Sequence, residues 1–574
     1  MKKLLKHMKG YGKECLLGPL FKLLEASFEL MIPLVVAKIV DTGIANGDTG
    51  YIVKMCLVMI ALGVVGLICA VTAQYFSAKA AVGFSARLRH HVMAHILKLN
   101  YTQIDRIGTS TMVTRMTSDI NQIQNGVNLT LRLLLRSPFV VFGAMIMAFT
   151  IDFQAALVFA GLIPVLCLVV FGIMLITIPM YRRVQNALDG VTGAARQNLT
   201  GVRVIRAFCK EDAQCDSFRE KTGELNHRQL SAGHISALMN PLTFVIVNLA
   251  VVILIQVGAI KVHSGALTQG MVVALYNYMS QILVELIKMA NLIITMTKAA
   301  ACGKRVEKIL EIPVDVSGGQ CKDTIRGKVE FRGVSAKYAD AAEASLENVS
   351  FTAQPGQTIG IIGGTGSGKT TLINLIPGFY PAQEGNILLD GTDIREYDRE
   401  ALRSQIGIVP QKAVLFQGTI RENLLWGDKK ASDDDLWTAL EVAQAREVVK
   451  NKDGELDALV EQGGTNFSGG QRQRLTIARA LARKPAILIL DDSASALDYA
   501  TDAALRMAIR GMENPPTTFI VSQRAASVRY ADVILVLDDG VLVASGTHDA
   551  LLESCEVYQE IYYSQFSKEV AQHG

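Results

Sequence analysis

Long apolar runs fill the first half of this 574-residue chain and stop near residue 300. A helix that crosses a bilayer needs about 20 apolar residues. Six runs meet that length, near residues 16–40, 52–78, 129–150, 154–178, 240–262 and 269–296. The pattern therefore predicts an all-α transmembrane domain with six spans over residues 1–305.

Lys and Arg are unevenly distributed between the connections of these spans. The connections near 41–50 and 151–153 contain none, whereas those near 79–128 and 179–239 contain several. Positive residues are retained on the cytoplasmic side of a membrane. We therefore expect a multi-pass protein of the plasma (inner) membrane with both termini in the cytoplasm.

The two long connections repeat apolar residues at three- and four-residue spacing, which is typical of helices. The membrane helices are therefore expected to continue into the cytoplasm, turn and return. The turns are expected at residues 108–119 and 201–212.

The pattern changes after the last apolar run. A Gly-containing linker is predicted over 306–325, and over 326–574 β-branched strands bounded by glycines alternate with amphipathic helices. The "LDDG" at 537–540 predicts a hairpin turn, and Thr547 is expected to cap a helix. The expected fold is a multidomain membrane protein whose six-helix domain precedes an α/β domain.

Composition narrows the choice of function. Half of the residues are hydrophobic and only 19% are charged, against about 25% in soluble domains. The net charge of +4 lies in no basic block, so nothing indicates nucleic-acid binding. The nine cysteines form no C-x-x-C pair, which favours reduced thiols over a disulfide framework or a zinc site.

A glycine loop between an apolar strand and a helix fits the phosphate-binding pattern G-x-x-x-x-G-K-[ST]. Its backbone amides would surround the phosphates, Lys369 would reach the β- and γ-phosphates, and Thr370 would ligate Mg²⁺. The alternative is an ordinary glycine-rich turn, which the flanking strand and helix disfavour. The predicted nucleotide-binding residues of the loop are Gly363, Gly364, Thr365, Gly366, Ser367, Gly368, Lys369, Thr370 and Thr371.

A second apolar strand, "AILILD", ends in Asp491. A carboxylate at the end of such a strand can hold the magnesium complex. Without the glycine loop, an ordinary core strand would be the better interpretation of this segment.

About twenty residues before Asp491, "TNFSGGQRQRL" places a Ser-Gly-Gly turn at a helix start. With the glycine loop, this turn resembles the ATP-binding cassette (ABC) superfamily, whose "LSGGQ" signature it matches except for Phe467. In that family the signature, here Ser468, Gly469, Gly470 and Gln471, closes on the nucleotide of a second cassette. Six spans followed by one cassette is similar to a half-transporter of ABC exporters, with residues 108–119 and 201–212 as the coupling helices.

The resemblance implies further roles. Gln411 matches the loop that senses magnesium, so the implied metal set is Thr370, Gln411 and Asp491. Tyr338 matches the aromatic residue that stacks on adenine, although one Tyr before a strand is also common as plain core. Asp498 of "SALD" matches the loop between the two cassettes.

Two positions depart from the family pattern. The family usually has Glu after the magnesium aspartate and His in its switch loop, whereas this chain has Asp492 and Gln523. A carboxylate that acts as the general base must lie within about 2.6–3.2 Å of the attacking water. Asp is one methylene shorter than Glu, and a displacement of about 1 Å can lower the reaction rate around 100-fold. The expected site binds Mg–ATP but hydrolyses it weakly. The expected partner is a non-identical half-transporter that carries Glu and His.

Two rival functions share this layout: an ordinary homodimeric exporter, and an ATP-gated channel or regulatory subunit. Spans rich in Met, Leu, Ile and Val suit an amphipathic cargo, such as a drug-like compound, a lipid or a hydrophobic peptide. Glu29 and Glu285 are candidate cargo contacts, because a charge inside a membrane is costly unless it faces a cavity or a partner. The alternative for Glu285 is an internal pair with Lys288.

Overall fold

The computed structural model describes residues 4–314, 318–338, 343–493 and 495–566. The chain divides into two compact units. The first comprises residues 1–97 and 108–313, and the second comprises residues 98–107 and 314–574. The middle of the predicted linker, residues 315–317, lies outside the described residues.

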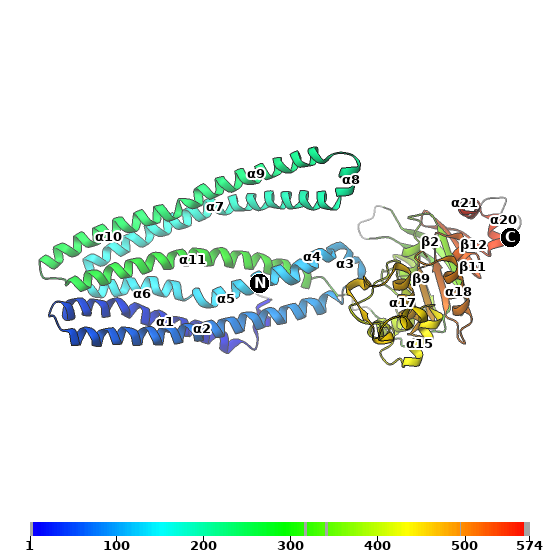
Figure 1. Cartoon of the computed structure of the whole chain (residues 1–574), viewed down its shortest axis with the longest axis horizontal. Coiled ribbons are helices and arrows are strands. Elements are labelled where there is room, and N and C mark those ends of the chain that lie inside the picture. The colour runs from blue at the N-terminus through cyan, green and yellow to red at the C-terminus, as the bar shows by residue number, and fades with distance from the viewer. Residues whose placement is uncertain (1–3, 315–317, 339–342, 494, 567–574) are drawn as a thin grey trace. The chain divides into compact units, whose positions relative to one another are not determined.

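The described part of the first unit is helical. Helices α7 and α9 run side by side and are joined by the short α8 (Figure 1). Its elements are η1 (Leu4–Met8), α1 (Gly12–Lys38), η2 (Ile39–Ile44), α2 (Thr49–Ile96), α4 (Thr109–Thr114), η3 (Arg115–Asp119), α5 (Ile120–Leu133), α6 (Arg136–Ile151), α7 (Phe153–Thr200), α8 (Val202–Ala207), α9 (Glu211–Ala237), α10 (Met239–His263) and α11 (Gln269–Leu310).

Five helical segments among the described residues are long and apolar enough to cross a membrane. They cover residues 49–96, 109–151, 153–200, 211–263 and 269–310. The expected first span falls on α1, which is 27 residues long but carries Lys22, Glu25 and Glu29 near its middle. The helical membrane domain is confirmed, whereas the count of six spans is not confirmed in full because of these charges.

Small side chains make up much of the core of the first unit. They let helix backbones approach closely, as is usual for helices packed in a membrane. Tyr278 on α11 adds a polar tie, because its hydroxyl donates a hydrogen bond of 2.7 Å to the Leu30 carbonyl on α1. Fully buried alanines include Ala26, Ala144, Ala148, Ala155, Ala156 and Ala274.

The second unit has a six-stranded sheet with the order β12-β11-β3-β10-β9-β6, in which β12 is antiparallel and the other neighbours are parallel. A four-stranded antiparallel sheet has the order β2-β1-β4-β5, and β7 pairs with β8. The strands are β1 (Val329–Ala336), β2 (Leu346–Ala353), β3 (Thr358–Gly363), β4 (Glu384–Leu389), β5 (Thr392–Asp393), β6 (Ile406–Val409), β7 (Gly418–Thr419), β8 (Leu459–Val460), β9 (Ile487–Asp491), β10 (Thr517–Val521), β11 (Val533–Asp538) and β12 (Val541–Gly546).

Side chains of the central strands alternate between two hydrophobic cores. Ile487 and Ile489 of β9 belong to one core, and Leu488 and Leu490 belong to the other. This period of two explains why the strand is an unbroken apolar run: both faces of the sheet are covered. The α/β cassette predicted from the sequence is confirmed.

Helices cover the sheets of the second unit. The predicted hairpin is present between β11 and β12, and a helix begins at His548 as expected, although the Thr547 side chain makes no capping hydrogen bond. The helices are α3 (Tyr101–Ile107), α12 (Lys369–Leu375), α13 (Arg399–Ser404), α14 (Ile420–Leu424), α15 (Asp433–Val442), α16 (Arg446–Lys450), η4 (Glu455–Asp457), η5 (Gln462–Gly464), α17 (Gly469–Leu481), α18 (Tyr499–Arg510), α19 (Ala525–Val528), α20 (His548–Ser554) and α21 (Glu556–Gln565).

The short helix α3 belongs to the second unit although it lies early in the chain. The ring of Tyr101 is 4.5 Å from that of Phe379, and the Tyr380 hydroxyl donates a hydrogen bond of 2.6 Å to Asp105. The turn predicted at 108–119 is wrong in position, because residues 109–119 are helical, in α4 and η3 of the first unit. The helices are interrupted earlier, at residues 97–100 and at Gly108.

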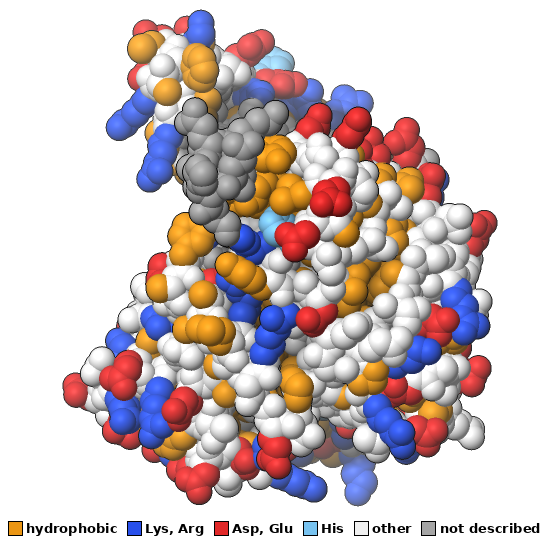
Figure 2. Space-filling view, turned by 90° about the vertical axis from the view of Figure 1, so that its right-hand side faces the viewer, with side chains coloured by type: hydrophobic (Ala, Val, Ile, Leu, Met, Phe, Trp, Pro, Cys, Tyr) orange, Lys and Arg blue, Asp and Glu red, His pale blue; other side chains and the backbone are white. Residues whose placement is uncertain are grey.

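On the face of the molecule in Figure 2, basic and acidic side chains are interspersed, so that face presents no long stretch of one sign.

Candidate nucleotide-binding site

A cavity of about 360 Å³ lies where β3, β9 and β10 end. These strands are parallel neighbours, so their carboxyl ends meet at one edge of the sheet, which is where open α/β sheets bind ligands. Residues far apart in the sequence thereby line one space. The cavity is lined by Tyr338, Ser345, Thr365, Gly366, Ser367, Gly368, Lys369, Thr370, Thr371, Gln411, Asp491, Asp492, Val521, Ser522 and Gln523.

The glycine loop needs its glycines for conformation and for space. Gly366 and Gly368 have φ values of +90° and +91°, which other residues rarely adopt. A Cβ on Gly368 would lie 2.4 Å from the carbonyl oxygen of Ser345. The loop therefore brings its backbone closer to its neighbour than a side chain would allow.

Lys369 is held inside the loop. Its ammonium group donates hydrogen bonds to the carbonyl of Gly363 at 2.9 Å, to the carbonyl of Gly364 and to the hydroxyl of Ser367 at 3.3 Å. Burial lowers the pKa of this ammonium, and the nearby carboxylates of Asp492 and Asp491 oppose that shift. A bound polyphosphate would add negative charge and favour the protonated form.

Asp491 and Thr370 form the side of the cavity that could hold a metal. The Thr370 hydroxyl donates a hydrogen bond of 3.2 Å to the Asp491 carboxylate, and burial raises the pKa of that carboxyl. Hydroxyl, carboxylate and amide oxygens suit Mg²⁺, and Gln411 supplies an amide in the same cavity. These residues therefore fit a magnesium ion that arrives with a nucleotide.

The two departures from the family pattern lie in this cavity. The amide of Gln411 donates a long hydrogen bond of 3.5 Å to the Asp492 carboxylate. Asp492 has φ +45°, an uncommon conformation for a residue other than glycine. The Gln523 side chain is exposed at the cavity wall, and its own backbone carbonyl accepts a hydrogen bond from Gln565.

Tyr338 also lines the cavity. Its hydroxyl is 3.1 Å from that of Thr371, and its ring meets Tyr380 edge to face with 5.0 Å between centroids. Two contacts therefore fix this ring. Tyr380, Ser345 and Ser522 were not predicted, because no local pattern distinguishes them from core or loop residues.

The signature residues do not line the cavity. Ser468 caps α17 in a capping box with Gln471, which satisfies the backbone amides of both residues. Asp498 likewise caps α18 by accepting the Thr501 amide hydrogen at 2.9 Å, and this bond lowers the pKa of Asp498. Both motifs are thus rigid helix starts outside their own chain's cavity.

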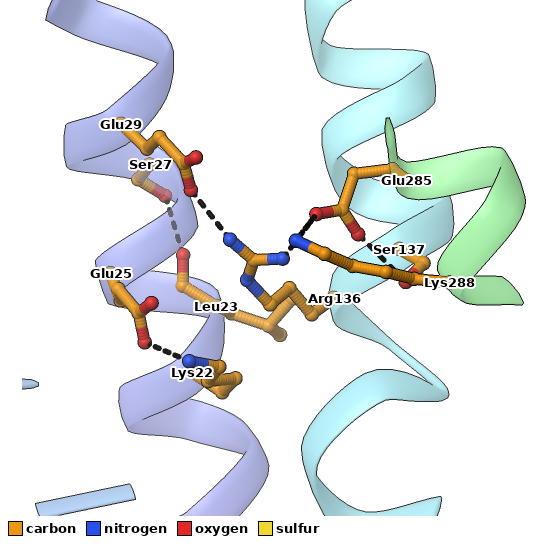
Figure 3. Close-up of polar contacts among 9 residues, drawn as sticks. All are labelled: Lys22, Leu23, Glu25, Ser27, Glu29, Arg136, Ser137, Glu285 and Lys288. Atoms are coloured by element: carbon orange, nitrogen blue, oxygen red, sulfur yellow. Dashed lines mark hydrogen bonds and ion pairs between the residues drawn. The ribbon is translucent and has the colours of Figure 1, made fainter. Parts of the chain in front are cut away.

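The two candidate cargo carboxylates lie in the first unit. Glu29 on α1 and Glu285 on α11 both accept hydrogen bonds from Arg136 (Figure 3). Glu285 also pairs with Lys288 at 2.8 Å, as its spacing had suggested.

Family models match both parts of the chain. Residues 15–286 match the ABC transporter transmembrane region, and residues 346–495 match the ABC transporter domain. An uncharacterised ABC transporter ATP-binding protein of Mycobacterium tuberculosis (strain CDC 1551 / Oshkosh) is 38% identical over 570 residues, which cover 97% of each chain. The chain belongs to the ABC exporter family.

Other relatives agree with this assignment. A Bacillus subtilis protein named as a probable multidrug resistance ABC transporter, YheI, is 33% identical and covers 83% of this exporter, with 82% of its own length matched. A bacterial Atm1-family ABC exporter with ATP bound has the same fold, with a TM-score of 0.80 and 22% identity over 97% of this chain and 98% of that one. This ABC exporter is therefore an ATP-hydrolysing membrane transporter, and proteins of this family bind ATP, generally with Mg²⁺, and act as dimers.

Proposed function

We propose that this exporter moves amphipathic compounds out of the cell as one half of a heterodimer, and that its own cavity binds Mg–ATP firmly but hydrolyses it slowly. The supporting observation is the composition of the cavity wall. Asp492 and Gln523 face the same space as Lys369, Thr370 and Asp491. The binding groups are therefore retained where the two catalytic positions differ from the family.

Firm binding of Mg–ATP is expected from the charge and geometry of the cavity. The loop amides and Lys369 hold the phosphates, and Tyr338 stacks on the base. Mg²⁺, held by Thr370, Gln411 and Asp491, would neutralise charge on the phosphate oxygens. Neither Asp492 nor Gln523 is needed for these contacts.

The weak hydrolysis rests on reach and on proton chemistry. An aspartate is one methylene shorter than a glutamate, and a misplacement on the order of 1 Å costs a general base around 100-fold. A glutamine amide donates a hydrogen bond to a phosphate but carries neither the positive charge nor the mobile proton of a histidine. Two changes at two positions weaken the reaction independently.

The partner would supply what this chain lacks. The signature sequence matches the family at Ser468, Gly469, Gly470 and Gln471. It would close on the nucleotide of a non-identical half-transporter that carries Glu and His. Asp498 would lie in the loop between the cassettes. ATP binding would then clamp the two cassettes, and hydrolysis at the partner's site would reset them.

The proposed domain boundaries are those predicted from the sequence. Residues 1–305 form the transmembrane domain, 306–325 the linker and 326–574 the cassette, in a plasma (inner) membrane with both termini in the cytoplasm. Residues 108–119 and 201–212 act as coupling segments. Within the second, α8 exposes Val204, which supports a role in docking.

The proposal is tested by comparing two purified samples. One is the chain alone, and the other is the chain together with a second half-transporter encoded by a neighbouring reading frame. We expect nucleotide binding by both samples and rapid hydrolysis only by the pair. Rapid turnover by the chain alone that Asp492→Asn abolishes would instead identify an ordinary homodimeric exporter. Passive flux through the pair when ATP is bound but not hydrolysed would identify the ATP-gated channel.

A further inference from the structure

A buried ion cluster joins three helices of the membrane domain (Figure 3). Arg136, the first residue of α6, donates one hydrogen bond to Glu285 of α11 and another, of 2.6 Å, to Glu29 of α1. Its side chain is only 6% exposed. The guanidinium is therefore the link between the three helices.

The local sequence explains why α6 begins at Arg136. Pro138 has no backbone N–H and disfavours a continuous helix. The helix is interrupted between Leu133, where α5 ends, and Arg136, where α6 starts. The side chains at the start of α6, Arg136 and Ser137, both bond to Glu285.

The two carboxylates of the cluster are not equivalent. Glu285 is 3% exposed and accepts hydrogen bonds from Arg136, Ser137 and Lys288. Glu29 is 38% exposed and accepts a hydrogen bond from Arg136 through one oxygen. Glu285 thus anchors the guanidinium, whereas Glu29 occupies the accessible side.

One buried donor of the cluster lacks an acceptor. The buried Nε of Arg136 has no hydrogen-bond partner among the described residues. An unpaired buried donor is unfavourable, so a group that accepts its hydrogen would be stabilised. Lys288 is 42% exposed and also has hydrogens beyond the one that Glu285 accepts.

The charges of the cluster are balanced, since Arg136 and Lys288 carry two positive charges and Glu29 and Glu285 carry two negative ones. The hydrogens that no carboxylate accepts belong to the two cations. A ligand group that accepts hydrogen bonds is therefore favoured over one that donates them, and a negative charge strengthens such bonds.

We infer that this cluster is a binding site for the oxyanionic head, a carboxylate or a phosphate, of an amphipathic molecule. The head exchanges with the Glu29 carboxylate on Arg136, while Glu285 keeps the guanidinium in place and Lys288 supplies a second donor. Glu29 is then the protein's own stand-in for the ligand. This inference deepens the proposed export function by naming the charge of the cargo.

Direct binding to the nucleotide-free full chain in phosphatidylcholine nanodiscs tests the site without relying on ATP hydrolysis. The probes are radiolabelled dodecanoate and dodecyltrimethylammonium, which share a tail and differ in charge, with binding to empty nanodiscs subtracted. Glu29→Gln is the key variant because it removes the stand-in. Glu25→Gln is the matched control, because Glu25 lies one turn away on α1 and pairs with Lys22 instead.

We expect Glu29→Gln to tighten dodecanoate binding about tenfold and to leave the ammonium probe unchanged, since Arg136 loses a competing acceptor. Glu25→Gln should change neither, and Arg136→Gln should abolish dodecanoate binding. A misfolded variant cannot produce the expected gain. Selective loss of the ammonium probe in Glu29→Gln would show a cation site, and unchanged dodecanoate binding would show a purely structural cluster; either result overturns the inference.

The source of the head is settled by adding phosphatidylglycerol to the nanodiscs. Displacement of dodecanoate by this lipid would show that a phospholipid phosphate takes the site. Retention of dodecanoate would show a site for a free acid. Both results support the oxyanion site, and neither depends on whether the cassette hydrolyses ATP slowly.

Discussion

Replacing Lys369 by methionine should weaken nucleotide binding by about 10- to 100-fold. The ammonium group is buried in the loop, with three protein acceptors, so it is positioned before the phosphates arrive. A hydrogen bond between charged groups contributes about 1.5–3 kcal/mol, and each 1.4 kcal/mol is about tenfold in affinity. Methionine keeps most of the side-chain volume, so the loss reports the charge rather than the packing.

The assay is the dissociation constant of a fluorescent ATP analogue with Mg²⁺, measured on the full chain. Lys412→Met is the matched control, because Lys412 is exposed and lies next to Gln411. We expect the control to bind the analogue as the unaltered chain does. Unchanged affinity in Lys369→Met would refute the assignment of this cavity as the phosphate site.

We make three further predictions for residues of the cassette. Tyr338→Ala should weaken ATP binding by about 1–2 kcal/mol, and Tyr338→Phe much less, because the proposed stacking on the base needs the aromatic ring and not the hydroxyl; equal losses in an equilibrium binding assay would contradict stacking. Ser468→Ala should destabilise the first turn of α17 by about 1 kcal/mol, seen as faster hydrogen exchange there, because a capping box is lost; unchanged exchange would contradict this. Burial lowers the pKa of His548, whose ring bonds to Tyr558, so the folded state favours the neutral ring; stability should therefore fall as pH drops below ~6.5, and His548→Gln should reduce that fall in thermal unfolding.

The cassette was largely predictable because its signals are local. The strand before the glycine loop ends at Gly363 and the helix begins at Lys369, where the residue pattern predicts them. The strand ending in Asp491 has apolar residues on both faces and was read correctly for that reason. Tyr380 was missed because its contact with Tyr338 joins segments separated by 42 residues, and no periodicity reports such a contact.

The membrane half was predictable in type but not in detail. Apolar length predicted helices, but the charges at Lys22, Glu25 and Glu29 make the first of them the least clear span. A break at Gly108, which has φ +77°, separates α3 from the helix that follows, and periodicity alone does not show it. The Arg136 cluster was missed as a unit because its members come from three distant helices.

Weak hydrolysis at Asp492 and Gln523 is best examined by measuring ATP turnover of the Asp492→Glu, Gln523→His double variant of the purified full chain. Both side chains already line the cavity with Lys369 and Asp491, so restoring the family's catalytic pair requires no new architecture. We expect slow turnover by the unaltered chain and a rise of about 100-fold in the double variant, with ATP affinity unchanged. Rapid turnover by the unaltered chain, with no gain in the double variant, would show that these two residues do not limit hydrolysis.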